Sequence, residues 1–156
     1  MDWVAHLVYG ALVWREKRRA TAGGPLERPG APADATRHLK VGAQGETLAY
    51  WHLRRSGYAI VARNRRPHAR SGELDMVGWD GQVLAFIEVK TRSGEQAGRP
   101  ETALSHEQQR RIVSSAWEYM RRLKRQPAAY RFDIASVLWE PARGYQVRVI
   151  KDAFNE

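Results

Sequence analysis

The stretch "GELDMVGWDGQVLAFIEVK", residues 72–90, restricts the fold more than any other part of the chain. Two apolar runs of strand length lie in it, separated by Asp80 and Gly81, the pair that favours a two-residue β-hairpin turn. A two-residue turn fixes which residues lie opposite each other, and therefore the side of the hairpin on which each side chain lies. The stretch predicts an antiparallel strand pair with one defined register.

The charged residues of this hairpin are predicted to share one face. With the turn at Asp80 and Gly81, Asp75 and Glu88 become diagonal neighbours whose Cα atoms lie roughly 7 to 8 Å apart, and Lys90 projects from the same side. A four-residue loop would keep this division, whereas a loop of odd length would break it. The opposite face is wholly apolar and is expected to be core: Leu74, Met76, Gly78, Val83, Ala85, Ile87 and Val89.

Two carboxylates a few ångströms apart in a half-buried sheet repel each other unless a positive group compensates them. Oxygen ligands, without Cys and without a nearby His pair, favour a hard divalent cation, Mg²⁺ or Mn²⁺, over zinc. Next to a phosphodiester such an ion polarises a phosphoryl oxygen, and Lys90 would stabilise the attacking hydroxide or the charge of the transition state. The alternative is an ordinary ion pair of Glu88 with Lys90, with Asp75 bonded to backbone donors at a strand end.

The other elements place the hairpin in a single α/β domain over residues 39–156, in which a mixed β-sheet is flanked by helices. The predicted order is α-β-β-β-α-β-β. The second helix carries an apolar stripe for the core: Ile112, Ala116, Tyr119, Met120 and Leu123. The expected elements are a helix closed by Gly57, a strand over 58–66, the hairpin, a helix over 105–125, and strands over 130–139 and 145–150.

Residues 1–38 are expected to stand apart from this domain. The apolar run over 3–14 is shorter than the roughly 18 to 20 residues of a spanning helix, and it lacks the basic start and the cleavage site of a signal peptide. Residues 20–38 are rich in Gly and Pro, which predicts a flexible linker. For the short helix over the apolar run, docking on the domain, contact with a membrane or partner, and disorder all stay open.

The chain is strongly basic. Its 26 Lys and Arg against 17 Asp and Glu give a formal charge of +9, which points to a polyanionic partner, either nucleic acid or an anionic membrane surface. The absence of cysteine excludes disulfides and thiolate metal sites, and a cytoplasmic location is expected. The residues expected to contact phosphates are Arg63, Asn64, Arg65, Arg66, Arg70, Arg92, Arg110 and Arg111.

Asp75 followed by "IEVK", which contains Glu88 and Lys90, resembles the metal-binding signature of the PD-(D/E)XK nuclease superfamily. The element order resembles the restriction-endonuclease-like core of that superfamily. A closer resemblance is to the YraN family of small bacterial proteins, which is grouped with nucleases by similarity to archaeal Holliday-junction resolvases. The resembling segments are 42–49, 57–66, 72–92, 131–134 and 152–154. The resemblance implies metal-dependent cleavage of DNA rather than RNA, with branched or structured DNA as the suggested substrate.

The same resemblance suggests Glu46, in the first helix, as a further acid near the metal. Glu46 is spaced seven residues from Leu39 and from Leu53, so it lies in a row that is expected to face the sheet. The alternative is that Glu46 only complements the positive end of the helix dipole. One departure is Gln108, where similar sequences tend to carry lysine; here Ser105 and Gln108 form a capping-box pattern.

These observations predict a Mg²⁺- or Mn²⁺-dependent endonuclease acting on DNA. Asp75, Glu88 and Glu46 would hold the metal, and Lys90 would stabilise the reacting oxygens. A second reading is a catalytically inactive nucleic-acid-binding or assembly protein with the same fold, for which Gln108 is the best hint. A third is a membrane-surface adaptor that uses the N-terminal helix. A homodimer fits the nuclease reading, since cutting two strands usually takes two active sites.

Overall fold

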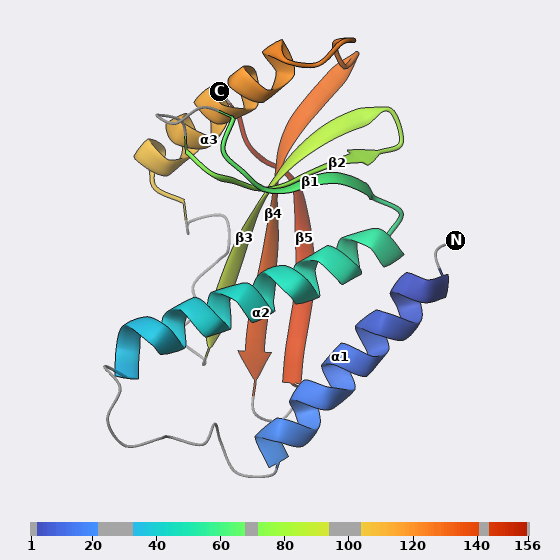
Figure 1. The fold of residues 1–156 in the computed structure, drawn as a ribbon, viewed down its shortest axis with the longest axis vertical. Helices are drawn as coiled ribbons and strands as arrows, with labels where there is room; N and C mark the ends of the chain where they lie inside the picture. The colour runs from blue at the N-terminus through green and yellow to red at the C-terminus, as the bar shows by residue number, and fades with distance from the viewer. Residues whose placement is uncertain (1–2, 22–32, 68–71, 94–103, 141–143, 156) are drawn as a thin grey trace.

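The computed structural model describes residues 3–21, 33–67, 72–93, 104–140 and 144–155. Five strands form one mixed sheet in the order β1-β2-β3-β4-β5, in which β3 and β4 run parallel and the other neighbours antiparallel (Figure 1). This confirms the predicted α/β fold and its element order. The elements are α1 (Trp3–Thr21), α2 (Ala33–Arg55), β1 (Ala59–Arg65), β2 (Leu74–Asp80), β3 (Val83–Ser93), α3 (His106–Arg121), β4 (Ala129–Glu140) and β5 (Gly144–Phe154).

Helices cover both faces of the sheet. On one face α2 packs around Leu53, Met76 and Ile87, and α1 lies against α2 and β5. On the other face α3 packs around Phe86 and Ile112. The sheet is strongly twisted, so that in Figure 1 the strands cross near the middle of the molecule, with α3 above the crossing and α2 and α1 below it. The core is therefore two apolar layers with the sheet between them.

The predicted capping box and inner stripe of α3 are confirmed. The Ser105 hydroxyl accepts from the Gln108 backbone N–H at 3.2 Å, and the Gln108 side chain accepts from the Ser105 N–H at 3.1 Å. Ile112 and Met120, on the stripe, are buried against the sheet. The helix ends at Arg121, four residues earlier than predicted.

The hairpin turn lies one residue later than predicted. Asp80 pairs with Val83, so the two-residue loop is Gly81 and Gln82, and Gly81 has the left-handed φ of +61° that glycine adopts without strain. The register therefore moves by two residues relative to the prediction. Because side chains alternate with a period of two, an even shift does not by itself exchange the two faces of the hairpin. Continuing the regular pairing one residue beyond Met76 and Ile87 would place Asp75 opposite Glu88 rather than Phe86.

The expectation that only one face of the hairpin is core is wrong. Met76 and Ile87 are buried, as predicted, and pack in the cluster that α2 covers, but Val77 and Phe86 are buried in the α3 cluster on the other face. Leu74, predicted on the same face as Met76, also packs in the α3 cluster. Both faces of the hairpin are therefore covered, and the charged residues lie where the regular pairing of β2 and β3 ends.

The N-terminal helix docks on the domain, the first of the three alternatives. Leu12 and Val13 of α1 pack against the core cluster of α2, and the ring of Tyr9 makes an edge contact with His52, with 5.4 Å between centroids. In the described part of the chain, no helix is long and apolar enough to cross a membrane.

The predicted linker is shorter than expected. Residues 20–38 were expected to be flexible, but α1 continues to Thr21 and α2 begins at Ala33, while residues 22–32 lie outside the described ranges. Residues 33–38 contain neither Gly nor Pro, and α2 begins directly after Pro32, so the helix starts where the helix-breaking residues stop.

Candidate active site

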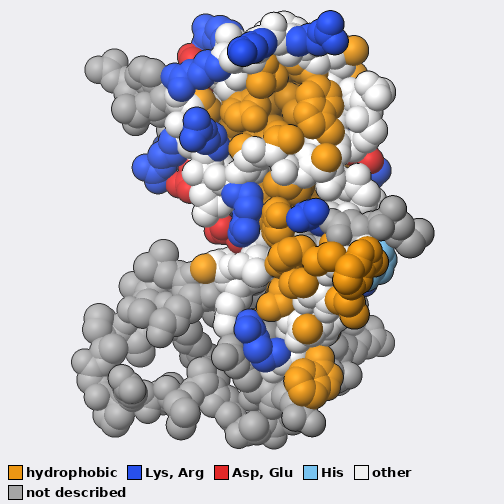
Figure 2. All heavy atoms as spheres, turned by 45° about the vertical axis from the view of Figure 1, so that its right-hand side comes forward, with side chains coloured by type: hydrophobic (Ala, Val, Ile, Leu, Met, Phe, Trp, Pro, Cys, Tyr) orange, Lys and Arg blue, Asp and Glu red, His pale blue; other side chains and the backbone are white. Residues whose placement is uncertain are grey.

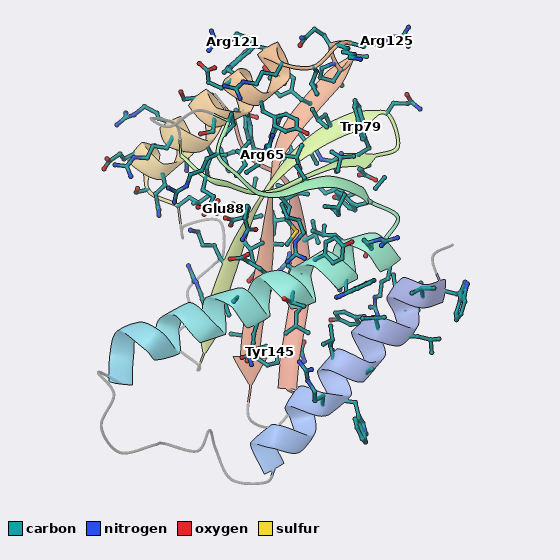
Figure 3. All side chains as sticks on the ribbon, viewed as in Figure 1. Arg65, Trp79, Glu88, Arg121, Arg125 and Tyr145 are labelled. Atoms are coloured by element: carbon teal, nitrogen blue, oxygen red, sulfur yellow. The ribbon has the colours of Figure 1, made fainter. Side chains whose placement is uncertain are left out.

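The three charged residues of the hairpin come together where β2 and β3 stop pairing regularly. Beyond the pair of Met76 and Ile87, the backbone N–H of Val89 donates to the Asp75 carboxylate at 2.8 Å. Within β3, Lys90 Nζ donates to Oε1 of Glu88, two residues earlier in the strand, at 2.8 Å. In Figure 3 the labelled Glu88 lies between α3 and α2. The sequence thus placed Asp75, Glu88 and Lys90 correctly as one group.

Electrostatic strain is concentrated on Asp75. The pKa of Asp75 is raised from 3.8 to about 7. Burial is the largest cause, and the negative charges of Glu88 and Glu46 act in the same direction. The Val89 N–H and Lys90 act against this rise. The Glu88 and Lys90 side chains are only 15% and 21% exposed. A buried acid with other acids nearby is stabilised in its charged form by an added positive charge.

Glu46 reaches this group because α2 approaches β3 closely. A Cβ atom on Gly45 would lie 1.8 Å from the hydroxyl oxygen of Thr91, so only glycine permits the approach. The Glu46 carboxylate accepts a 3.0 Å hydrogen bond from the side-chain amide of Asn64. Since α2 begins at Ala33, Glu46 lies well inside the helix and not in its first turn, which removes the helix-dipole alternative.

Asn64 has a backbone conformation that is unusual for its residue type. Its φ is +47°, in the left-handed region that asparagine tolerates better than most residues. This conformation occurs at the residue whose amide donates to Glu46, one position before the end of β1. Asn64 was predicted to contact phosphate; in the structure its amide orients an acid of the candidate site.

The residues present fit a hard divalent cation. Asp75 and Glu88 supply oxygen donors, and a cation would offset both the burial of Asp75 and its repulsion from Glu88, the two largest causes of its raised pKa. Among the described residues, no three acidic or histidine side chains already form a ligand cluster. Mg²⁺ commonly binds through one or two carboxylates and keeps several waters, so a pair of acids suffices.

The predicted phosphate-contacting residues are dispersed around this group. Arg63 lies on β1 with its guanidinium 4.5 Å from the centre of the Tyr50 ring. Arg66 pairs with Glu73 at 2.9 Å, and Arg111 pairs with Glu107 on the surface of α3. Of the remaining predicted arginines, Arg65 and Arg110 are exposed and Arg92 is half-buried on β3. Arg70 lies outside the described residues.

A buried network of charged side chains around Asp133 was not predicted from the sequence. Asp133 is fully buried and accepts hydrogen bonds from Arg131 Nε at 2.8 Å, the Tyr58 hydroxyl at 3.1 Å and the Asp152 N–H at 3.0 Å. Arg131 also bridges to Asp80, which was predicted to be a turn residue. The network reaches the turn end of the hairpin through Asp80 and, among the described residues, shares no hydrogen-bond partner with Asp75. Its sequence signal was an Arg and an Asp two residues apart in the apolar strand "YRFDIASV".

The chain is similar to bacterial proteins of one family. The profile of the Uncharacterised protein family UPF0102 matches residues 45–137, more than half of the chain. A UPF0102 protein of Solibacter usitatus is 48% identical over 97 residues, which are 62% of this chain and 74% of the relative. A UPF0102 protein of Symbiobacterium thermophilum is 43% identical over 116 residues, 74% of this chain and 97% of the relative. One of Rhodococcus opacus is 38% identical over 117 residues, 75% of this chain and 98% of the relative.

Proposed function

We propose a function from two premises: the chain belongs to the Uncharacterised protein family UPF0102, the YraN family that the sequence resembles, and its hairpin joins Asp75, Glu88 and Lys90 in one group. The function is divalent-metal-dependent hydrolysis of phosphodiesters in DNA, with branched or structured DNA as the substrate. The fold is of the restriction-endonuclease-like type, but a fold hosts many functions, so the proposal depends on the site.

The observation that carries the proposal is the grouping of two acids and a lysine at the end of the hairpin: the Asp75 carboxylate accepts from the Val89 N–H, and Glu88 next to Val89 pairs with Lys90. Lys90 is thus paired with Glu88, while the pKa of Asp75 rises to about 7 through burial and the nearby charge of Glu88. Asp75 and Glu88, with Glu46 as a supplementary acid, would hold Mg²⁺ or Mn²⁺. Such an ion supplies polarisation of the phosphoryl oxygen and a bound water of lowered pKa.

Lys90 would stabilise negative charge during the reaction. Its ammonium group is held 2.8 Å from Glu88 and is largely shielded from solvent, so its position is fixed before substrate arrives. A preorganised cation stabilises the charge that develops on the phosphate oxygens at little reorganisation cost. Asn64 would act through Glu46 by keeping its carboxylate oriented.

The substrate class follows from charge. The +9 chain favours a polyanion, and Arg63, Arg65 and Arg110 are exposed arginines of the described region that can contact a phosphate backbone. No element of the described fold presents a base-reading motif of the helix-turn-helix or RNA-recognition type. Binding is therefore expected to follow the shape and charge of DNA more than its sequence.

One observation favours a second candidate, a DNA-binding protein without turnover. Gln108 stands where similar sequences tend to carry lysine, and both its backbone N–H and its side-chain oxygen are used in the cap of α3. A position committed to a capping box does not serve substrate. If a lysine there is needed for cleavage, this chain would bind DNA and metal and leave the DNA intact.

The test combines calorimetric Mn²⁺ binding with cleavage of duplex, single-stranded and four-way-junction DNA. It compares the wild type with Asp75→Asn, Glu88→Gln and Lys90→Met. We expect both acid variants to lose metal binding and cleavage, and Lys90→Met to keep metal binding but lose cleavage. Glu118→Gln, a half-buried ion-pair acid on α3, is the matched control and should behave as the wild type. Metal binding without cleavage by the wild type would favour the second candidate. An absence of metal binding would refute both metal-dependent readings.

A further inference from the structure

The outer side of α1 exposes large apolar side chains. Trp3 is 70% exposed, Leu7 63% and Trp14 57%, and Val4 is also exposed. Helical spacing places Trp3, Leu7 and Trp14 on one row, because they are four and seven residues apart. Figure 2 shows hydrophobic side chains gathered in the lower part of its face, the part of the molecule where Figure 1 places α1. We call Trp3, Leu7 and Trp14 the outer row.

The outer row is not required for docking α1 on the domain. The docking contacts come from the other side of the helix, where Ala5 is buried and Leu12 and Val13 pack on the core cluster. Tyr9 belongs to the same inner side, with its ring against His52 and under the guanidinium of Arg55 at 4.4 Å. The helix is therefore apolar on two opposite sides, of which the domain covers one.

The charge that follows the outer row is complementary to an anionic surface. Four of the five residues from 15 to 19 are basic, and α1 continues as helix through this segment. Tryptophan is enriched at the level of lipid headgroups, and basic residues beside an apolar helix face are attracted by anionic lipids. An apolar outer row that is followed along the same helix by a basic segment matches a helix lying in the plane of such a surface.

The size of the outer row argues against a second protein as its partner. With Val4, these side chains expose on the order of 500 Å². A standard protein interface takes about 800 Å² from each partner, and its core is depleted in charged residues. Immersion of a helix face in a lipid headgroup layer needs no such complementary area.

Helix α1 is also dispensable for the family's domain. The family profile begins at residue 45, and the Symbiobacterium relative is matched over 97% of its own length by 116 residues of this chain. That relative has no room for an equivalent of α1 with its connection. The helix is thus an addition to a domain that exists without it, which is what a separate localising function requires.

The candidate active site faces elsewhere. In Figure 3, α2 lies between the labelled Glu88 and α1. Contact through the outer row is therefore expected to leave Glu88 accessible. From these observations, we propose that α1 binds the chain to an anionic lipid surface through Trp3, Leu7 and Trp14, with the basic segment over residues 15–19 adding electrostatic attraction to the lipid phosphates.

The test is cosedimentation of the full chain with vesicles. The wild type is expected to bind vesicles containing phosphatidylglycerol and to bind pure phosphatidylcholine vesicles at least about tenfold more weakly, with binding that falls as salt rises. The variant Trp3→Gln, Leu7→Gln and Trp14→Gln should bind the anionic vesicles at least about tenfold more weakly than the wild type. Glutamine is a good helix former, so the substitutions remove apolar surface without breaking α1.

The control variant is Val61→Gln with Trp117→Gln, which removes exposed apolar side chains of the domain at 53% and 44% exposure. It should bind vesicles as the wild type does, and circular dichroism should show equal helix content in all three proteins. Equal vesicle binding by the outer-row variant would refute the proposal, since basic charge alone would then account for it. The proposal would also be refuted if the wild type did not bind vesicles. It would be refuted as well if sedimentation equilibrium showed a wild-type dimer and an outer-row variant that is monomeric. DNA binding measured on the same proteins separates this outcome from the proposed nuclease function, which does not need the outer row.

Discussion

Replacing Asp75 by asparagine should stabilise the metal-free protein, and the gain should grow with pH. An acid whose pKa is raised on folding favours the folded state only while it is protonated, so its ionisation removes stability as pH rises through the folded pKa. The pKa of Asp75 is 3.8 in the unfolded chain and about 7 in the folded protein. Relative to low pH, where the acid is protonated in both states, the free energy of unfolding is therefore lower by about 2 kcal/mol at pH 5 and by about 4 kcal/mol at pH 8. Asparagine does not ionise, and its side-chain oxygen can still accept from the Val89 N–H. The variant should therefore gain about 2 kcal/mol more over the wild type at pH 8 than at pH 5.

The assay is urea denaturation of both proteins at the two pH values, followed by circular dichroism, with and without Mn²⁺. At a Mn²⁺ concentration about a hundred times the dissociation constant, the wild type should gain about 2.7 kcal/mol, and Asp75→Asn should gain almost nothing. A difference between the proteins that does not change with pH would refute the electrostatic account of the pair. So would a wild type as stable as the variant at pH 8 without metal.

Four further variants test other parts of the structure. Asp80→Asn should show the opposite pH dependence to Asp75→Asn: hydrogen bonds from Lys151 and Arg131 lower the pKa of Asp80, so its stabilisation exists above its ordinary pKa and is lost as pH falls, which urea denaturation at falling pH would detect. Gly45→Ala should lower the free energy of unfolding by about 1 to 3 kcal/mol and weaken Mn²⁺ binding in calorimetry, because a Cβ would overlap the Thr91 side chain. Asp133→Asn should cost about 3 kcal/mol of unfolding free energy in urea and leave Mn²⁺ binding unchanged, since it breaks a buried ion pair whose hydrogen-bond partners differ from that of Asp75. Arg63→Gln should weaken DNA binding in fluorescence anisotropy and reduce the salt dependence of the affinity by about one ion, and an unchanged salt slope would remove Arg63 from the interface.

The parts of the fold predicted from the sequence depend on short-range rules. The capping box of Ser105 and Gln108 formed as predicted, because both partners lie within four residues. The apolar stripe of α3 is read from helical periodicity alone, and Ile112 and Met120 are buried where it indicated. The start of α2 was placed too late because residues 33–38 have no apolar face to mark them, although they contain no helix breaker either.

What the sequence did not reveal depends on contacts between distant segments. The network of Asp133, Arg131 and Tyr58 joins residues 73 to 75 positions apart in the chain, and no local pattern specifies such a contact. The same holds for Gly45, since its need to be glycine arises only when α2 meets Thr91 of β3. Asn64 was assigned to phosphate because it lies in a basic run, and only the packing of β1 beside α2 brings it to Glu46.

The residues of the candidate site lie together although the predicted hairpin register was wrong, and strand geometry explains this. The turn forms at Gly81 and Gln82, one residue later than predicted, which shifts every cross-strand pair by two residues. Side chains alternate between faces with a period of two, so an even shift does not exchange the faces, and Glu88 and Lys90 project from the same side of β3. Regular pairing ends at Met76 and Ile87, and beyond it the Val89 N–H bonds the Asp75 carboxylate, which keeps Asp75 beside Glu88 and Lys90. The grouping of these residues is therefore more predictable from sequence than the exact position of the turn that joins the strands.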